Sequence, residues 1–161
     1  MSIRTKYVSG LLIIILLLIA SFYFQFVDNV LPCPLCILQR FAFGLLGLWF
    51  LIGIFVANSS FGRIIINLLC FLTSILGMVL AGRQLFLQYF PSLNTPECGV
   101  SIQYMLDVLP FNEVVQKIFA GGAECSQRGF EILHLNLAEW AFIWFIIFLL
   151  FSLRLFQKSQ K

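Results

Sequence analysis

Residues 7–27 read YVSGLLIIILLLIASFYFQFV, an apolar stretch without a charged residue. About 20 such residues form a helix about 30 Å long, which matches the hydrocarbon thickness of a bilayer. A secretory signal peptide also has an apolar core after basic residues, but that core is usually about 7–15 residues long and ends at small residues. Because this stretch is longer and ends among aromatic residues, we predict an uncleaved first transmembrane helix.

The chain of 161 residues contains three further apolar runs and is 61% hydrophobic and 11% charged. Soluble domains average about 45–50% and 25%. A polar turn at 58–63 follows the second run, and prolines in 91–96 end the third because proline cannot continue a helix. We therefore predict one all-α integral membrane domain over 1–161, a four-helix bundle with one long loop at about 91–136. Its predicted spans are 7–27, 35–56, 64–87 and 137–153.

The basic residues indicate how the bundle is oriented. Four spans place both termini on one side, and basic residues gather at those termini and in the 58–63 turn, with no acidic residue among them. Because cytoplasmic ends of membrane proteins are enriched in lysine and arginine, we predict cytoplasmic termini and an outward-facing loop 91–136. The net charge of +3 is too small to indicate a nucleic-acid partner. The basic residues at the termini and in this turn are Arg4, Lys6, Arg63, Arg154, Lys158 and Lys161.

A Cys-x-x-Cys pair, Cys33 and Cys36, stands where the second span begins. Such pairs serve both zinc sites and redox sites. Pro34 suits the first turn of a helix, where its missing N–H would have no intrahelical partner. If Cys33 caps the helix, Cys36 lies near the positive end of the helix dipole, which stabilises a thiolate and makes the thiol more reactive. Arg40 follows at i+4 and adds a positive charge on the same face.

Four of the five cysteines are predicted to lie on the outer side, where disulfides persist. Two structural disulfides, a tetrahedral zinc site and a relay of two exchangeable disulfides all remain possible. Zinc is disfavoured because the chain has one Cys-x-x-Cys and the compartment is oxidising, so we predict no metal site. A two-residue spacer closes a loop too small to stabilise a fold much, so the relay fits best. It runs from Cys98 and Cys125 to Cys33 and Cys36, while Cys70 lies in mid-span and is predicted to be inert.

A relay that oxidises other proteins must pass two electrons onward, and the sequence contains no haem or nucleotide-binding motif. A membrane quinone needs only an apolar groove, a few polar groups for its carbonyls and a nearby thiolate. Arg40 in the second span, and Arg83 and Gln84 near the end of the third, reach the same outer face. Ionisable residues within spans are functional candidates, although long basic side chains also snorkel to lipid headgroups. We therefore predict that these three residues bind a quinone, with snorkelling as the alternative for the arginines.

With these residues placed, the chain resembles the DsbB family, the quinone reductases that reoxidise the thiol oxidase DsbA. The resemblance extends over nearly the whole chain and is strongest in the first motif. It rests on four segments: PCPLCILQR at 32–40, GRQLFLQ at 82–88, PECG at 96–99 and GAEC at 122–125.

The resemblance implies a role for each cysteine of the relay. Cys98 would receive the attack of a reduced DsbA-like partner while Cys125 is released. Cys33 would exchange with the loop pair through a Cys33–Cys125 disulfide, and Cys36 would face the quinone. Arg40 would then bind a quinone carbonyl and stabilise developing negative charge.

The resemblance also implies a compartment, an acceptor and a partner. It places the chain in a bacterial inner membrane with the four relay cysteines in the periplasm, and it implies ubiquinone or menaquinone as the electron acceptor. The partner would be a DsbA-like oxidase with a thioredoxin fold. A vitamin K epoxide reductase-like enzyme is the runner-up, but that family carries its Cys-x-x-Cys on a late helix. A membrane scaffold with two static disulfides is the non-enzymatic alternative.

Overall fold

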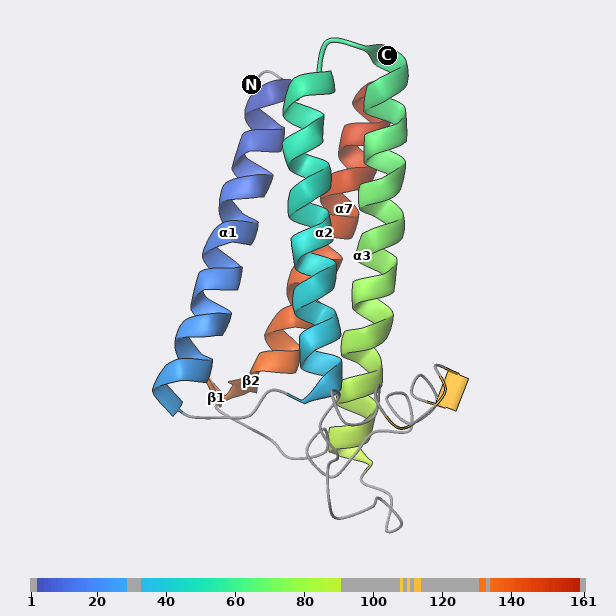
Figure 1. The fold of residues 1–161 in the computed structure, drawn as a ribbon. Helices are drawn as coiled ribbons and strands as arrows, with labels where there is room; N and C mark the ends of the chain where they lie inside the picture. The colour runs from blue at the N-terminus through green and yellow to red at the C-terminus, as the bar shows by residue number, and fades with distance from the viewer. Residues whose placement is uncertain are drawn as a thin grey trace.

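A computed structural model describes residues 3–28, 33–90, 108, 110, 112–113, 131–132 and 134–159. Within these residues, four long helices run along one another (Figure 1). A two-residue antiparallel hairpin precedes the last helix, with Ile132 opposite Leu135. The helices are α1 (Ile3–Asp28), α2 (Pro34–Val56), α3 (Ser60–Tyr89) and α7 (Leu137–Ser159), and the strands are β1 (Glu131–Ile132) and β2 (Leu135–Asn136).

Each of the four helices is long and apolar enough to cross a membrane. With 23 to 30 residues each, they measure about 35–45 Å, more than the hydrocarbon core of about 30 Å. The prediction of a four-helix membrane protein is therefore confirmed. The helices extend beyond the predicted spans because the apolar pattern marks the hydrocarbon core, whereas a helix continues into the headgroup layer. Arg4, Arg63 and Arg154 accordingly lie inside helices rather than beside them.

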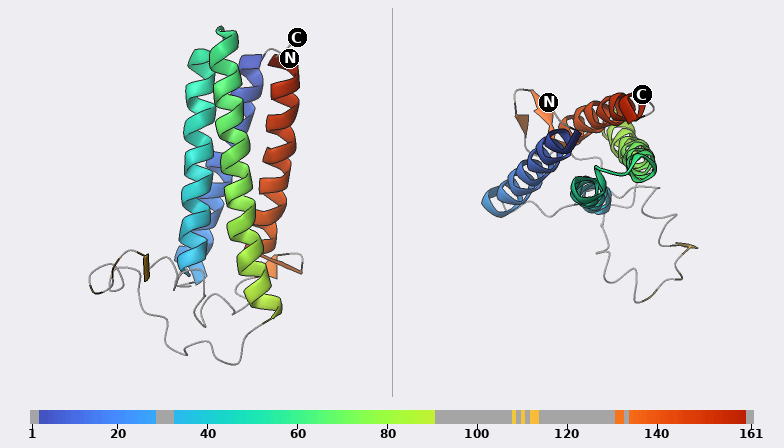
Figure 2. Two further views of the ribbon diagram at one scale, coloured as in Figure 1. Left: turned by 90° about the vertical axis from the view of Figure 1, so that its right-hand side faces the viewer. Right: turned by 90° about the horizontal axis from the view of Figure 1, so that it is seen from above.

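The chain termini and the Cys-x-x-Cys pair lie at opposite ends of the bundle. Figure 2 shows the two termini at the same end of the bundle. At the opposite end lie the start of α2, the end of α3, the start of α7 and the hairpin (Figure 1). Cys98 and Cys125 lie outside the described residues.

The helices do not pack equally. Helix α3 contacts both α2 and α7, whereas α1 packs chiefly on α2. Only 11% of the apolar window of α1 is buried, against 44% for α3. In the view along the bundle, α1 slants away from the other helices toward the end where α2 begins (Figure 2). Helix α1 is therefore peripheral, and its far half depends on specific contacts to remain close to α2.

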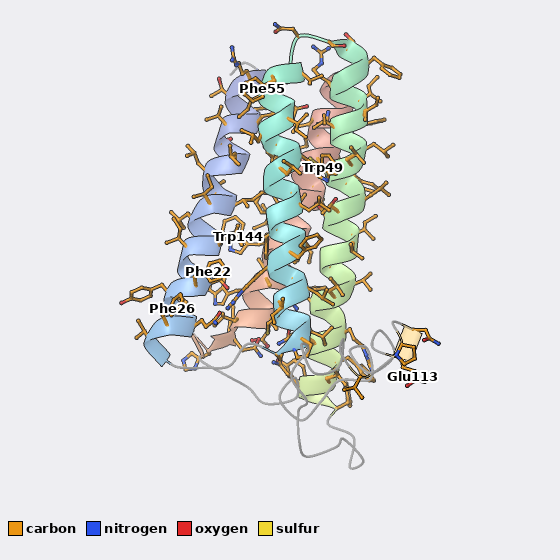
Figure 3. All side chains as sticks on the ribbon, in the orientation of Figure 1. Phe22, Phe26, Trp49, Phe55, Glu113 and Trp144 are labelled. Carbon is orange, nitrogen blue, oxygen red and sulfur yellow. The ribbon has the colours of Figure 1, made fainter. Side chains whose placement is uncertain are left out.

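Aromatic stacking fills the centre of the bundle. The rings of Phe43 on α2 and Phe145 on α7 stack with centroids 4.1 Å apart and planes 13° apart. Gly77 on α3 leaves the room for this stack, because a Cβ there would lie 2.1 Å from a Phe145 ring carbon. Polar bonds add to the packing: Trp49 Nε1, between α2 and α3 in Figure 3, donates to Thr73 Oγ1 at 3.1 Å.

We expect Gly77→Ala to lower the free energy of unfolding by about 1–3 kcal/mol, because the extra methyl forces the Phe145 ring off its stacking position. Unfolding titrations in mixed micelles measure this change. Gly44→Ala is the matched control, since a Cβ at Gly44 meets nothing within 4 Å. Equal stability of the two variants would contradict the packing role of Gly77.

Candidate functional site

The Cys-x-x-Cys pair begins α2 as the sequence predicted. Cys33 is the N-cap, with extended backbone angles (φ −64°, ψ 156°), and its Sγ accepts a hydrogen bond from the Cys36 N–H at 3.3 Å. Pro34 occupies the first helical position. The side chain of Cys33 thus satisfies one of the N–H groups that the start of a helix leaves without an intrahelical partner. Local chain geometry therefore brings both sulfurs to the start of the helix.

The two sulfurs form a hydrogen-bonded dithiol. The Cys33 thiol donates to Cys36 Sγ across 2.9 Å, longer than the S–S bond of about 2.05 Å, so the two sulfurs are not joined in a disulfide. Cys33 is only 3% exposed, whereas Cys36 is half-buried. Cys33 belongs to a small apolar cluster with Leu80 and Leu87 of α3. The dithiol is therefore held against α3, with Cys36 as the more accessible of the two sulfurs.

A buried carboxamide from α3 reaches the Cys36 sulfur. Gln84 Nε2 donates to Cys36 Sγ at 3.1 Å, and Gln84 Oε1 lies 3.5 Å from the same sulfur. The oxygen also accepts a hydrogen bond from Gln39 Nε2 of α2 at 2.7 Å. Sequence reasoning placed Gln84 at this end of the bundle but expected it at a quinone carbonyl. In the structure its carboxamide contacts the Cys36 sulfur.

Arg40 turns toward α1. Its Nε donates to Ser21 Oγ at 2.8 Å, its Nη2 donates to the Ser21 carbonyl at 3.2 Å, and its Nη1 donates to Gln25 Oε1. The guanidinium also lies 5.1 Å from the centroid of the Phe22 ring, and Figure 3 shows Phe22 on the half of α1 near the start of α2. These contacts tie the slanting half of α1 to α2. The three hydrogen bonds do not exhaust the N–H donors of a guanidinium.

Arg83 has a different environment from Arg40. It is half-buried, and its guanidinium lies 5.5 Å from the ring centroid of Phe86 on the same helix. This contact does not join Arg83 to the dithiol. Among the three residues that the sequence predicted at a quinone, only Gln84 hydrogen-bonds a sulfur of the pair within the described part of the chain.

Three polar residues of this end were not expected as site residues. Ser21 and Gln25 lie in the first apolar run, and Gln39 lies between Cys36 and Arg40 in sequence. Their position in apolar runs could have indicated them, because an uncharged polar residue inside a membrane span needs a hydrogen-bond partner. Sequence alone could not say which partner each residue finds.

A second polar network fastens α3 to the start of α7. Asn136 Nδ2 donates to Gln88 Oε1 at 2.8 Å, and Tyr89 OH donates to Glu139 Oε1 at 2.5 Å. Asn136 and Glu139 also exchange bonds in a capping box: the Glu139 N–H donates to Asn136 Oδ1, and the Asn136 N–H donates to Glu139 Oε2. His134, with φ 66°, makes the turn of the preceding hairpin. This network holds the end of α3, and Gln84 with it, in place beside the dithiol.

The site offers sulfur chemistry and an apolar setting. Within the described ranges, no group of three or more histidine, cysteine or acidic side chains is placed to bind a metal ion. Ile37 and Phe41, which follow Cys36 and Arg40 on α2, are 41% and 69% exposed. The half-buried Cys36 thiol contacts the Gln84 amide, and the Arg40 guanidinium is held against α1 at the same end of the bundle.

Comparison with known proteins identifies the family. The family model described as disulfide bond formation protein DsbB matches residues 4–155. The chain belongs to the DsbB family. Relatives named disulfide bond formation protein B include those of Nitrosococcus oceani, 34% identical over 95% of this chain and 90% of the relative, and Marinobacter nauticus, 35% identical over 92% and 90%. A third, from Hahella chejuensis, is 38% identical over 90% of this chain and 88% of the relative.

Membership of the DsbB family settles the broad class of the protein. It is a multi-pass membrane protein of disulfide bond formation, and its reaction class is disulfide oxidoreduction. The vitamin K epoxide reductase-like alternative is set aside, because the DsbB model covers nearly the whole chain. A static scaffold is also a poorer account than an oxidoreductase for a member of this family.

Proposed function

We propose that this protein is a thiol:quinone oxidoreductase that reoxidises a periplasmic DsbA-like oxidase and passes two electrons to a membrane quinone. The observation that carries the proposal is the hydrogen-bonded dithiol of Cys33 and Cys36 at the start of a membrane-spanning helix. An S–S bond between these sulfurs requires a small movement, and Cys36 is the more exposed of the two. DsbB membership supports thiol oxidation as the reaction.

The relay is carried over from the resemblance and balances in electrons and protons. A thiolate of the reduced partner attacks Cys98 of a Cys98–Cys125 disulfide, and Cys125 then attacks Cys33 of the Cys33–Cys36 disulfide, which releases Cys36. The second thiol of the partner attacks the mixed disulfide with Cys98, which releases the partner in its oxidised form. Cys98 then attacks Cys125 and re-forms the Cys98–Cys125 disulfide, which leaves Cys33 and Cys36 reduced. Formation of their disulfide gives up two electrons and two protons, which convert the quinone to hydroquinone. The net reaction oxidises one partner dithiol for each quinone.

The exposure of the two cysteines supports the assignment of Cys36, rather than Cys33, to the quinone. Cys33 is 3% exposed and packs against α3, whereas Cys36 is half-buried. In the proposal, Cys36 faces the quinone ring and Arg40 donates to a ring carbonyl with the N–H groups that its bonds to α1 leave over. A charged donor placed before the reaction stabilises negative charge as it develops on that oxygen. Gln84 and Arg83 complete the polar side of the quinone site.

The direction of electron flow requires an oxidising acceptor. The DsbA couple lies near about −120 mV, and an acceptor about 30 mV more oxidising gains about 1.4 kcal/mol for two electrons. Ubiquinone and menaquinone are the acceptors that we propose. Ile37 and Phe41, which are exposed apolar residues in the first turns of α2, are compatible with such molecules at this end of the bundle.

The proposed location is the bacterial inner membrane, with both termini in the cytoplasm and the dithiol at the periplasmic face. The lysines and arginines near the termini and in the 58–63 turn support this orientation through the positive-inside rule. The arrangement of the bundle is compatible with it, because the termini share one end and Cys33 lies at the other (Figure 1).

Thiol trapping in cells tests the proposal. With quinone synthesis on, we expect Cys33 and Cys36 to be trapped as a disulfide, and with quinone synthesis off we expect them to accumulate as thiols. Cys70, which is buried in mid-helix, is the internal control and should be trapped as a thiol under both conditions. A redox state of the pair that ignores the quinone supply would contradict the proposal.

A further inference from the structure

Two buried glutamines from different helices bond to each other next to the Cys36 sulfur. Gln39 on α2 is 5% exposed and Gln84 on α3 is 4% exposed. Burying an amide in an apolar environment costs free energy unless its polar atoms are hydrogen-bonded. Within the described residues, no buried side-chain nitrogen or oxygen lacks a partner. The hydrogen bond between the two amides and the bond from Gln84 to Cys36 explain how both glutamines can be buried.

The bond between the two amides sets which atom faces the sulfur. Gln39 Nε2 donates to Gln84 Oε1 at 2.7 Å, so the oxygen is the acceptor of the pair, and Gln84 Nε2 donates to Cys36 Sγ at 3.1 Å. If the Gln84 amide turned over, its N–H groups would face those of Gln39 and its oxygen would approach the sulfur. A thiolate repels a carbonyl oxygen but accepts a bond from N–H. Gln39 therefore favours the orientation that stabilises a thiolate.

The donors in contact with this sulfur are neutral. Within the described residues, Cys36 Sγ accepts from the Cys33 thiol and from the Gln84 amide. The hydrogen bonds of the Arg40 guanidinium instead go to Ser21 and Gln25 of α1. The amide thus supplies a directed donor that carries no net charge into the membrane.

We propose that Gln39 is a positioning residue of the thiol–quinone reaction: it orients the Gln84 carboxamide so that its N–H stabilises the Cys36 thiolate. This role rests on the proposed function, because the thiolate of Cys36 is the species that faces the quinone. Gln39 does not touch the sulfur or the acceptor and acts only through Gln84. The donor lies on α3, so rotation or withdrawal of that helix also changes the reactivity of Cys36.

The test measures Cys36 alone, in full-length protein purified without quinone or partner. In a Cys33→Ala/Cys98→Ala/Cys125→Ala background, the alkylation rate of Cys36 is followed against pH, and Cys70 does not interfere because it is fully buried. We expect Gln39→Met and Gln84→Met each to slow alkylation at neutral pH about tenfold and to move the midpoint upward by about one pH unit. The double variant should match Gln84→Met, because Gln39 has no other route to the sulfur.

Ser74→Ala is the control. Ser74 is also a buried polar residue of α3, but its hydroxyl donates to the Cys70 carbonyl of the same helix at 2.8 Å, so the midpoint should stay where it is. Gln39→Asn provides a second variant if Gln39→Met fails to fold, since the shorter amide cannot span the same distance to Gln84. An unchanged midpoint in either single variant, or additive shifts in the double variant, overturns the proposal. Because no quinone is present, this result is independent of whether the protein reduces quinones.

Discussion

Cys36→Ser protein is expected to reduce quinone at least about a thousandfold more slowly than the unchanged protein, because it loses the sulfur whose oxidation supplies the electrons. A serine hydroxyl occupies nearly the same volume but forms no disulfide with Cys33. The loss of quinone absorbance during turnover with a reduced thioredoxin-fold partner measures the rate. Cys33→Ala should have the same effect, since either sulfur alone cannot form the bond.

Two controls separate chemistry from folding in this experiment. Cys70→Ala also removes a cysteine, but Cys70 is buried within α3, so turnover should persist. Cys36→Ser should also still form a mixed disulfide between Cys98 and the partner, because that step precedes the quinone. Turnover at the wild-type rate in both Cys36→Ser and Cys33→Ala would refute the relay and leave a static role for the pair.

Arg40→Ala is expected to raise KM for quinone about tenfold or more while leaving KM for the partner protein nearly unchanged. In the proposed function Arg40 donates a charge-assisted hydrogen bond to a quinone carbonyl, and such a bond is stronger than a neutral one. Arg40→Lys should lie between the two, since an ammonium keeps the charge but lacks the planar fork of donors. Steady-state kinetics with each substrate varied in turn measure the two constants.

The hydrogen bonds between Arg40 and α1 require a matched control. A Ser21→Ala/Gln25→Leu double variant removes the side-chain acceptors on α1 and keeps the guanidinium. If Arg40 binds quinone, this double variant should affect KM for quinone much less than Arg40→Ala does. Equal increases would show that Arg40 acts only by holding α1 against α2.

The four spans and the cap of α2 could be predicted because both follow from local physics. A run of about 20 apolar residues spans a bilayer wherever it stands in the chain. Pro34 fits the first turn of a helix and the Cys33 side chain caps it, and both effects act within a few residues. The prediction that Arg83 and Gln84 lie at the same end as Cys36 needed only antiparallel helices of similar length. The tiny hairpin before α7 was missed, because two residues per strand make no readable pattern.

The contacts at the sulfur depend on how the helices rotate and lean, which side-chain packing sets between distant segments. Gln84 rather than Arg83 meets Cys36 because α3 is fixed in rotation by packing such as Gly77 against Phe145 and by the bond from Gln88 to Asn136. Arg40 turns to α1 because Ser21 and Gln25 of that helix offer acceptors within hydrogen-bond reach. Adjacent residues on a helix point about 100° apart, so a small rotation exchanges one neighbour for the next. The spans and the dithiol therefore follow from local chain chemistry, whereas the hydrogen bonds that tune Cys36 follow from long-range packing.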